Sequence, residues 1–139
     1  MFVFDTNVLS EVMKATPDPA VVNWLTGCPA EMMFTTTICQ TEILYGLRRL
    51  PDSQRRQRLT VAAEALFTQE LVGRILPFDA AAAVIYADLR IARERAGRPL
   101  AVEDGMIAAI ARVVGASVVT RNTEDFAGCG ILVINPWQT

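Results

Sequence analysis

Short apolar segments alternate along the chain with longer segments in which apolar residues recur at helical spacing. The short segments are rich in β-branched and aromatic residues and are bounded by polar or turn-forming residues, which is typical of buried strands. The predicted strands are Phe2–Phe4, Met32–Thr36, Arg74–Phe78, Ser117–Thr120 and Ile131–Ile134. Because one or two predicted helices separate successive strands, the pattern indicates an α/β fold with a mostly parallel sheet.

Helix start and stop signals divide the longer segments. The expected helices are Val8–Met13, Val21–Leu25 between Asp18-Pro19 and Gly27, one capped by Thr37 and reaching Leu50, one through Leu59 and Leu66, Ala80–Ala96, and Glu103–Val114. Glycine at positions 97 and 115 supplies the C-terminal stop of the last two. On the long alanine-rich helix we expect Arg90, Arg93 and Glu94 to face water.

The length and composition indicate one globular domain spanning residues 1–139. Of the 139 residues, 52% are apolar, which suffices for a single core. No apolar run approaches the roughly 18 residues needed to cross a bilayer, and the first residues lack the pattern of a secretory signal. We therefore expect a cytoplasmic protein, with Cys28, Cys39 and Cys129 as reduced thiols.

The composition also excludes several kinds of chemistry. The chain has no histidine, which removes Ser-His-Asp and Cys-His nucleophile systems and histidine-ligated metal sites. Lys14 is its sole lysine, and it carries neither a P-loop nor a GxGxxG motif. A net charge of −2 is not that of a basic nucleic-acid binder. A divalent ion bound to carboxylates reverses the local charge, however, so the net charge does not exclude a phosphate substrate.

Four acidic residues are expected at one edge of the predicted sheet. Asp5 directly follows the first strand, Glu42 lies early in the helix after the second, Asp104 opens a later helix, and Asp125 lies beyond the fourth strand. Ligands of open parallel sheets gather at the carboxyl ends of the strands. Converging carboxylates repel one another unless they are neutralised, and hard oxygen ligands suit Mg²⁺ or Mn²⁺. This combination favours metal-assisted hydrolysis of a phosphodiester.

Each of these residues also has an ordinary structural role. Asp5 and Asp104 are suitable helix caps, Glu42 is a common residue on a solvated helix face, and Asp125 and Asn122 suit a turn. The arginine groups at 48–58 and 90–98 fit either an RNA backbone or a solvated helix face. The aromatic residues at positions 24, 45, 86 and 137 are more typical of a core than of base stacking.

Taken together, four segments resemble the PIN-domain family, and more narrowly its toxin ribonucleases of the VapC and FitB type. The segments are FDTNVLSE at 4–11, TEILYG at 41–46, EDGMIAAIA at 103–111 and TRNTEDF at 120–126. The resemblance covers nearly the whole chain. It implies a three-layer α/β/α sandwich and a metal-dependent endoribonuclease that acts as the toxin of a bacterial toxin–antitoxin pair.

The resemblance also implies roles for individual residues and partners. Asp5, Glu42 and Asp104 would coordinate Mg²⁺ or Mn²⁺, Thr6 would orient the site, and the fourth position would be Asp125, with Asn122 in support. A water activated by the metal would cleave RNA. The implied partners are a small antitoxin that places an arginine among the carboxylates and a second copy of the chain in a homodimer. Contact with DNA would occur only through the antitoxin.

Two other functions remain open at this point. A Mg²⁺-dependent phosphatase or phosphotransferase would use Asp5 as its nucleophile, but Asn7 stands where such enzymes need a second aspartate. A non-catalytic module with the same scaffold would merely dock a partner protein or RNA, because a fold does not guarantee its chemistry.

Overall fold

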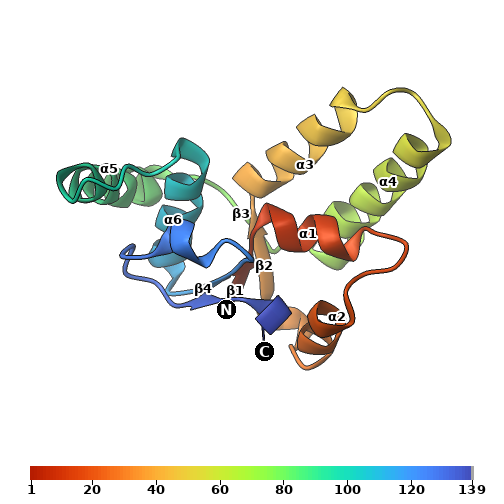
Figure 1. Ribbon diagram of the computed structural model, residues 1–139, viewed down its shortest axis with the longest axis horizontal. Coiled ribbons are helices and arrows are strands. Elements are labelled where there is room, and N and C mark those ends of the chain that lie inside the picture. The colour runs from red at the N-terminus through yellow and green to blue at the C-terminus, as the bar shows by residue number, and fades with distance from the viewer. Residues whose placement is uncertain (139) are drawn as a thin grey trace.

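The computed structural model describes residues 1–138 and shows a five-stranded, all-parallel sheet (Figure 1). The strands are β1 (Phe2–Phe4), β2 (Met33–Thr36), β3 (Ile75–Leu76), β4 (Ser117–Val119) and β5 (Val133–Ile134), in the order β3-β2-β1-β4-β5. The register pairs Val3 with Phe34 on one side and with Val118 on the other. The predicted α/β class and parallel sheet are confirmed.

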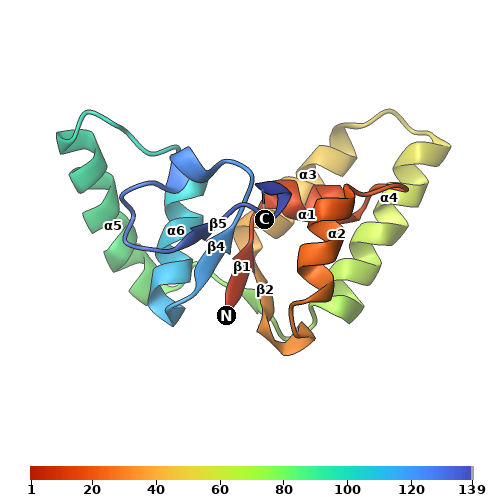
Figure 2. The same ribbon diagram turned by 60° about the horizontal axis from the view of Figure 1, so that its bottom comes forward.

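Helices cover both faces of the sheet, as the predicted three-layer sandwich requires (Figures 1 and 2). The helices are α1 (Thr6–Val12), α2 (Pro19–Thr26), α3 (Thr37–Arg49), α4 (Gln54–Ala65), α5 (Ala80–Arg95) and α6 (Val102–Val114). α1 to α4 lie on one side, and α5 packs with α6 on the other. None of the helices in residues 1–138 combines the length and apolarity needed to span a membrane.

Capping side chains explain where the helices begin. Asp18, Ser53 and Asp79 each accept a hydrogen bond from a backbone N–H of the first turn that follows. The cap of α3 is Thr36, whose hydroxyl accepts from the Cys39 N–H at 3.1 Å, and the expectation of Thr37 was wrong by one residue. Gly115 ends α6 in the left-handed region, with φ of 69°, as its C-terminal stop predicted.

Two further expectations need correction. No α-helix joins β4 to β5 within residues 1–138; a short 3₁₀ helix, Thr123–Phe126, makes that connection. Arg93 does not face water but is buried, and its guanidinium donates to the carbonyl oxygens of Arg98 and Ala127 at 2.7 and 2.8 Å. Buried backbone carbonyls need donors, and this arginine supplies them where the loop after α5 meets the segment after β4.

The core has a dense part at β1, β4 and α6. Val3, Val118 and Val119 are fully buried in these two adjacent strands, and Ile107 and Ile110 of α6 belong to the same buried cluster. α6 is also rich in small residues, which lets it approach closely: a Cβ placed on Gly105 would lie 2.6 Å from Cε2 of Tyr86 on α5. This close packing fixes the first turn of α6, which carries Asp104.

Candidate metal and phosphodiester site

The order of the strands places a switch point between β1 and β4. The connections from β1 run toward β2 and β3, whereas the connection from β3 returns across the other face to β4. Loops therefore part in opposite directions at the carboxyl ends of β1 and β4, which is where open α/β sheets bind ligands. An open pocket of about 480 Å³ lies at this point and is lined by Asp5, Glu42, Asp104 and Asn122, among others.

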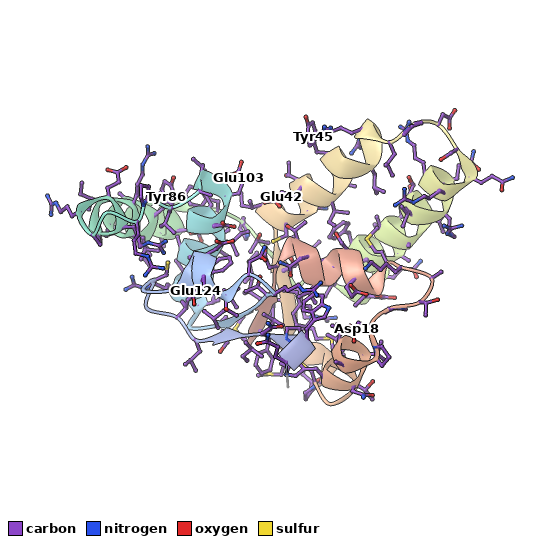
Figure 3. The ribbon with its side chains drawn as sticks, viewed as in Figure 1. Asp18, Glu42, Tyr45, Tyr86, Glu103 and Glu124 are labelled. Carbon is purple, nitrogen blue, oxygen red and sulfur yellow. The ribbon has the colours of Figure 1, made fainter. Side chains whose placement is uncertain are left out.

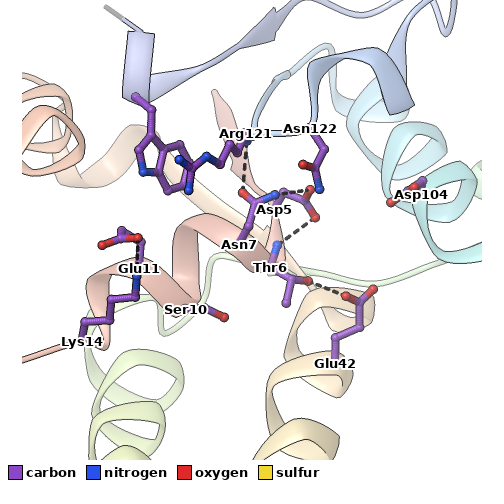
Figure 4. A pocket seen from close by; sticks show the side chains of 11 residues that line it. Asp5, Thr6, Asn7, Ser10, Glu11, Lys14, Glu42, Asp104, Arg121 and Asn122 are labelled. Carbon is purple, nitrogen blue, oxygen red and sulfur yellow. Dashed lines mark hydrogen bonds and ion pairs between the residues drawn. The ribbon is translucent and has the colours of Figure 1, made fainter. Parts of the chain in front are cut away.

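Asp5 is held by the densest hydrogen-bond network of the pocket (Figure 4). Its Oδ1 accepts from the backbone N–H of Thr6 at 2.8 Å, so the residue also caps α1. Its Oδ2 accepts from the Thr120 hydroxyl at 2.8 Å and from the Asn7 amide at 3.5 Å. The functional and capping roles of Asp5 are therefore compatible, because the two oxygens are engaged from different sides.

Thr120 is the residue at the centre of this network. Its buried hydroxyl donates to Asp5 and accepts from both the Asn7 amide and the Asn122 N–H, each at 3.1 Å. One hydroxyl has one donor and two acceptor sites, so every site is used. Thr120 thereby joins the end of β4 to the end of β1.

Glu42 reaches the pocket from the second turn of α3. Its Oε2 accepts from the Thr6 hydroxyl at 2.8 Å, so Thr6 bridges Asp5 and Glu42 through its backbone and its side chain. Burial raises the pKa of Glu42, and the charges of Asp5 and Glu103 raise it further against the opposing bond from Thr6. Thr6 is therefore hydrogen-bonded to two acidic residues of the pocket, and its role in orienting a metal site stays a prediction.

Asp104 faces the same pocket from the first turn of α6 but is held differently. The alternative role of N-cap is wrong, because the cap position is Ala101. Burial raises the pKa of Asp104 to about 6, and the charges of Asp5, Asp125, Glu42 and Glu103 add to the rise. Burial also raises the pKa of Asp5, against the hydrogen bonds from Thr120 and Thr6.

The carboxylates repel one another and stand apart. Within residues 1–138, no three acidic or sulfur-bearing side chains lie close enough to hold one ion together as they stand. Asp104 lies across the pocket from Asp5 and Glu42 in Figure 4. Three carboxyl groups with raised pKa values at one pocket are nevertheless an arrangement that a divalent cation would stabilise.

The two candidates for the fourth position occupy different places. Asn122 lines the pocket, whereas Asp125 is exposed in the 3₁₀ helix that follows and does not line it. The charge of Asp125 still raises the pKa of both Asp5 and Asp104. Asp125 therefore lies near the rim and acts on the site through its charge.

Sequence reasoning missed several residues around the pocket. Glu103 precedes Asp104 in α6 and stands opposite Glu42 on α3 in Figure 3. Arg121 and Trp137 line the side of the pocket away from α3, and Lys14 pairs with the buried Glu11 at 2.9 Å. Glu103 directly precedes Asp104, so the sequence offered a signal for it. Trp137 lies far along the chain from the acidic residues, and the sequence offered no signal that it reaches the pocket.

Comparisons with known proteins agree with this geometry. The PIN domain profile matches residues 2–129. The VapC ribonuclease Y4jK of Sinorhizobium fredii is 39% identical, and the toxin FitB of Neisseria gonorrhoeae is 35% identical, each over 99% of both chains. A solved structure of FitAB bound to an IR36 DNA fragment contains a chain that is 34% identical, with a TM-score of 0.93 over 100% of this chain and 97% of that one.

These matches extend along the whole length of the chain, so the resemblance noted in the four sequence segments is confirmed. The chain belongs to the PIN-domain family and is similar throughout to VapC and FitB toxins of that family.

Proposed function

We propose that the protein is a metal-dependent endoribonuclease and the toxin of a toxin–antitoxin pair. The observation that carries the proposal is the meeting of Asp5, Glu42 and Asp104 from β1, α3 and α6 at the switch point of the sheet. The similarity to a VapC ribonuclease supports RNA as the substrate. Asn7 bonds Thr120 and Arg121, so the position where a phosphatase needs a second aspartate is already used for structure.

The donor set fits Mg²⁺ or Mn²⁺. All three side chains offer carboxylate oxygens, the ligands that these hard cations prefer, and no histidine or clustered thiol in residues 1–138 competes for a softer metal. Asp5, Glu42 and Asp104 would hold the ion, and Asp125 would add charge from the rim. When bound, the metal supplies charge neutralisation and an activated water for hydrolysis.

The residues of the chain supply position and polarity. Thr120 and Thr6 hold Asp5 and Glu42 in fixed orientations, so these two carboxylates need little rearrangement to bind. Water adds to phosphorus and the P–O3′ bond breaks, which gives one product with a 5′-phosphate and one with a 3′-hydroxyl. No general acid or base from histidine is required for this reaction.

We also propose an antitoxin partner and a homodimer. An apolar groove of about 270 Å³ between α1, α3 and α4 shares Thr6 and Glu42 with the acidic pocket. A peptide segment in this groove would bring a basic side chain next to the carboxylates, where an arginine forms strong bidentate hydrogen bonds. The structure of FitAB bound to a DNA fragment supports an assembly that contacts DNA, and we assign that contact to the antitoxin. Activity on RNA would take place in the cytoplasm.

The direct test is cleavage of total RNA and bulk tRNA by purified protein free of antitoxin, with Mg²⁺, Mn²⁺ or EDTA. We expect products with either metal and none with EDTA. Cleavage that persists in EDTA would contradict the proposed metal dependence. The ribonuclease activity would be contradicted if folded protein binds Mn²⁺ yet cleaves no RNA. The RNA pools tested include RNA extracted from cells in which the protein arrests growth.

A further inference from the structure

The side of the pocket away from α3 carries a cation held on an aromatic ring. Cζ of Arg121 lies 4.9 Å from the centroid of the Trp137 ring. Arg121 directly follows Thr120 at the end of β4, and Trp137 lies in a short 3₁₀ helix, Pro136–Gln138. Figure 4 shows Arg121 across the pocket from Glu42. Cation–π contact of this kind favours a fixed guanidinium position.

The backbone of Arg121 is tied to the network that holds Asp5, and Trp137 is held separately. The Arg121 N–H donates to Oδ1 of Asn7 at 3.2 Å, and the Asn7 amide donates to Thr120. The Trp137 N–H donates to Oδ1 of Asn135 at 2.9 Å, and its ring packs against the core. The guanidinium therefore has a defined position relative to the acidic residues, and ordering it costs little entropy on binding.

Arg121 lowers the pKa of Glu11 through its charge but forms no ion pair in the part of the chain that the structure describes. Its side chain is exposed, and no carboxylate of residues 1–138 lies within ion-pair distance of it. The other cation of the pocket, Lys14, is paired with Glu11. An arginine stacked on a ring keeps its N–H donors at the edge of the plane, where they match two oxygens of a phosphate.

We propose that Arg121, held on Trp137, binds a backbone phosphate of the RNA next to the one that is hydrolysed. The inference rests on the proposed ribonuclease function and adds to it a residue that positions the substrate. The carboxylates and their metal act on one phosphate, and a strand laid across the pocket brings a neighbouring phosphate to the opposite rim. The contact is to the backbone, so it strengthens binding without selecting a base.

The test compares Arg121→Ala and Arg121→Lys with a matched control, Arg112→Ala. Arg112 is an exposed arginine in the last turn of α6 and does not line the pocket. KM and kcat are measured for bulk tRNA with Mg²⁺. Binding of the same tRNA, labelled with fluorescein at its 3′ end, is measured by anisotropy with Ca²⁺ across a series of KCl concentrations.

For Arg121→Ala we expect KM to rise about tenfold while kcat changes less than about twofold. The slope of log K against log[KCl] should become shallower by about 0.8, the effect of losing one phosphate contact. Arg121→Lys should restore the wild-type slope but lower KM only part of the way to the wild-type value. Lysine keeps the positive charge but lacks the forked guanidinium that binds two phosphate oxygens. A merely structural role for Arg121 would not produce this salt signature or its rescue by lysine.

The outcomes separate this inference from the function on which it rests. If the wild type cleaves tRNA and Arg121→Ala has the KM and salt slope of Arg112→Ala, the phosphate contact is wrong and the ribonuclease activity stands. If the wild type neither cleaves nor binds RNA, the proposed function fails, and the contact fails with it. A loss confined to kcat would also overturn the inference, because it would place Arg121 in the chemical step.

Discussion

Asp5 and Asp104 line the same pocket and differ in how their carboxylates are held. Asp5 accepts hydrogen bonds from Thr6, Asn7 and Thr120, while no donor of residues 1–138 reaches the carboxylate of Asp104. Burial and neighbouring charges raise the pKa of Asp104 to about 6, without an opposing hydrogen bond. One side of the site is thus pre-organised, and the other stores repulsion that a cation would relieve.

The largest expected effect comes from the pre-organised side. Asp5→Asn keeps the shape and removes the charge, so we expect RNA cleavage to fall about a thousandfold while the fold is retained. The matched control is Asp18→Asn, because Asp18 is also a helix N-cap, accepting from the Ala20 N–H at 2.9 Å. Asparagine caps helices well, so both variants should fold. Equal activity in the two purified variants would contradict a role for Asp5 beyond capping.

A smaller effect is expected when the support of Asp5 is removed. Thr120→Val keeps the shape and deletes the hydroxyl, so cleavage should fall about 10- to 100-fold and unfolding should become about 1–3 kcal/mol easier. Thr35→Val is the control: its buried hydroxyl donates to the Phe4 carbonyl at 2.8 Å and does not contact a carboxylate. For Thr35→Val we expect a similar loss of stability in urea denaturation and near-normal RNA cleavage. Matching activity losses would show that the effect is one of stability alone.

Asp125 tests the Asp104 side of the site, where neighbouring charges act without hydrogen bonds. Because it is exposed and acts by charge, we expect Asp125→Asn to lower cleavage by about tenfold, less than Asp5→Asn. Glu124→Gln, at the neighbouring exposed acid, should have little effect on cleavage rates. A loss as large as that of Asp5→Asn would make Asp125 a direct ligand, and no loss at all would remove it from the site.

The smallest effect is on stability. With a folded-state pKa of about 6 and an ordinary value of 3.8, the Asp104 carboxyl disfavours folding increasingly as pH rises between these values. Asp104→Asn should therefore stabilise the metal-free protein at pH 7 by about 1 kcal/mol after allowance for solvent screening, although it removes a proposed metal ligand.

The measurement is urea denaturation in EDTA at pH 7.5 and pH 4.5, with Asp88→Asn on the exposed face of α5 as control. The stabilisation by Asp104→Asn should shrink at pH 4.5, because the Asp104 carboxyl of the folded wild type is then protonated. A variant less stable than wild type at pH 7.5, with the control unchanged, would show that Asp104 is not under repulsion.

The sequence predicted the parts of the site that depend on local order along the chain. Asp5 follows a strand directly, Glu42 lies in the second turn of α3 and Asp104 in the first turn of α6, so their edge of the sheet could be inferred from strand direction alone. The roles of Thr120 and Asn7 could not, because they depend on β1 and β4 being neighbours. Strand order is set by packing between distant segments, which periodicity does not reveal.

The same reasoning explains the errors. Arg93 lies among charged residues at the end of α5, and the pattern favours solvent there; burial follows from carbonyl groups of a segment more than 30 residues away. Aspartate is a common helix-capping residue, but the N-cap of α6 is Ala101, three residues before Asp104. Trp137 reaches the pocket from the C-terminal region, and an aromatic residue alone does not indicate which surface it joins.

The central claim is that Asp5, Glu42 and Asp104 hold a divalent metal at the end of β1. The most direct measurement is a crystal structure with Mn²⁺, using anomalous scattering to locate the ion. We predict one dominant peak among these three residues, with a carboxylate oxygen of Asp5 at about 2.1 Å and Asp104 drawn closer to Asp5. A fully folded crystal at saturating Mn²⁺ with no peak there, or with its strongest peak elsewhere, would contradict the account.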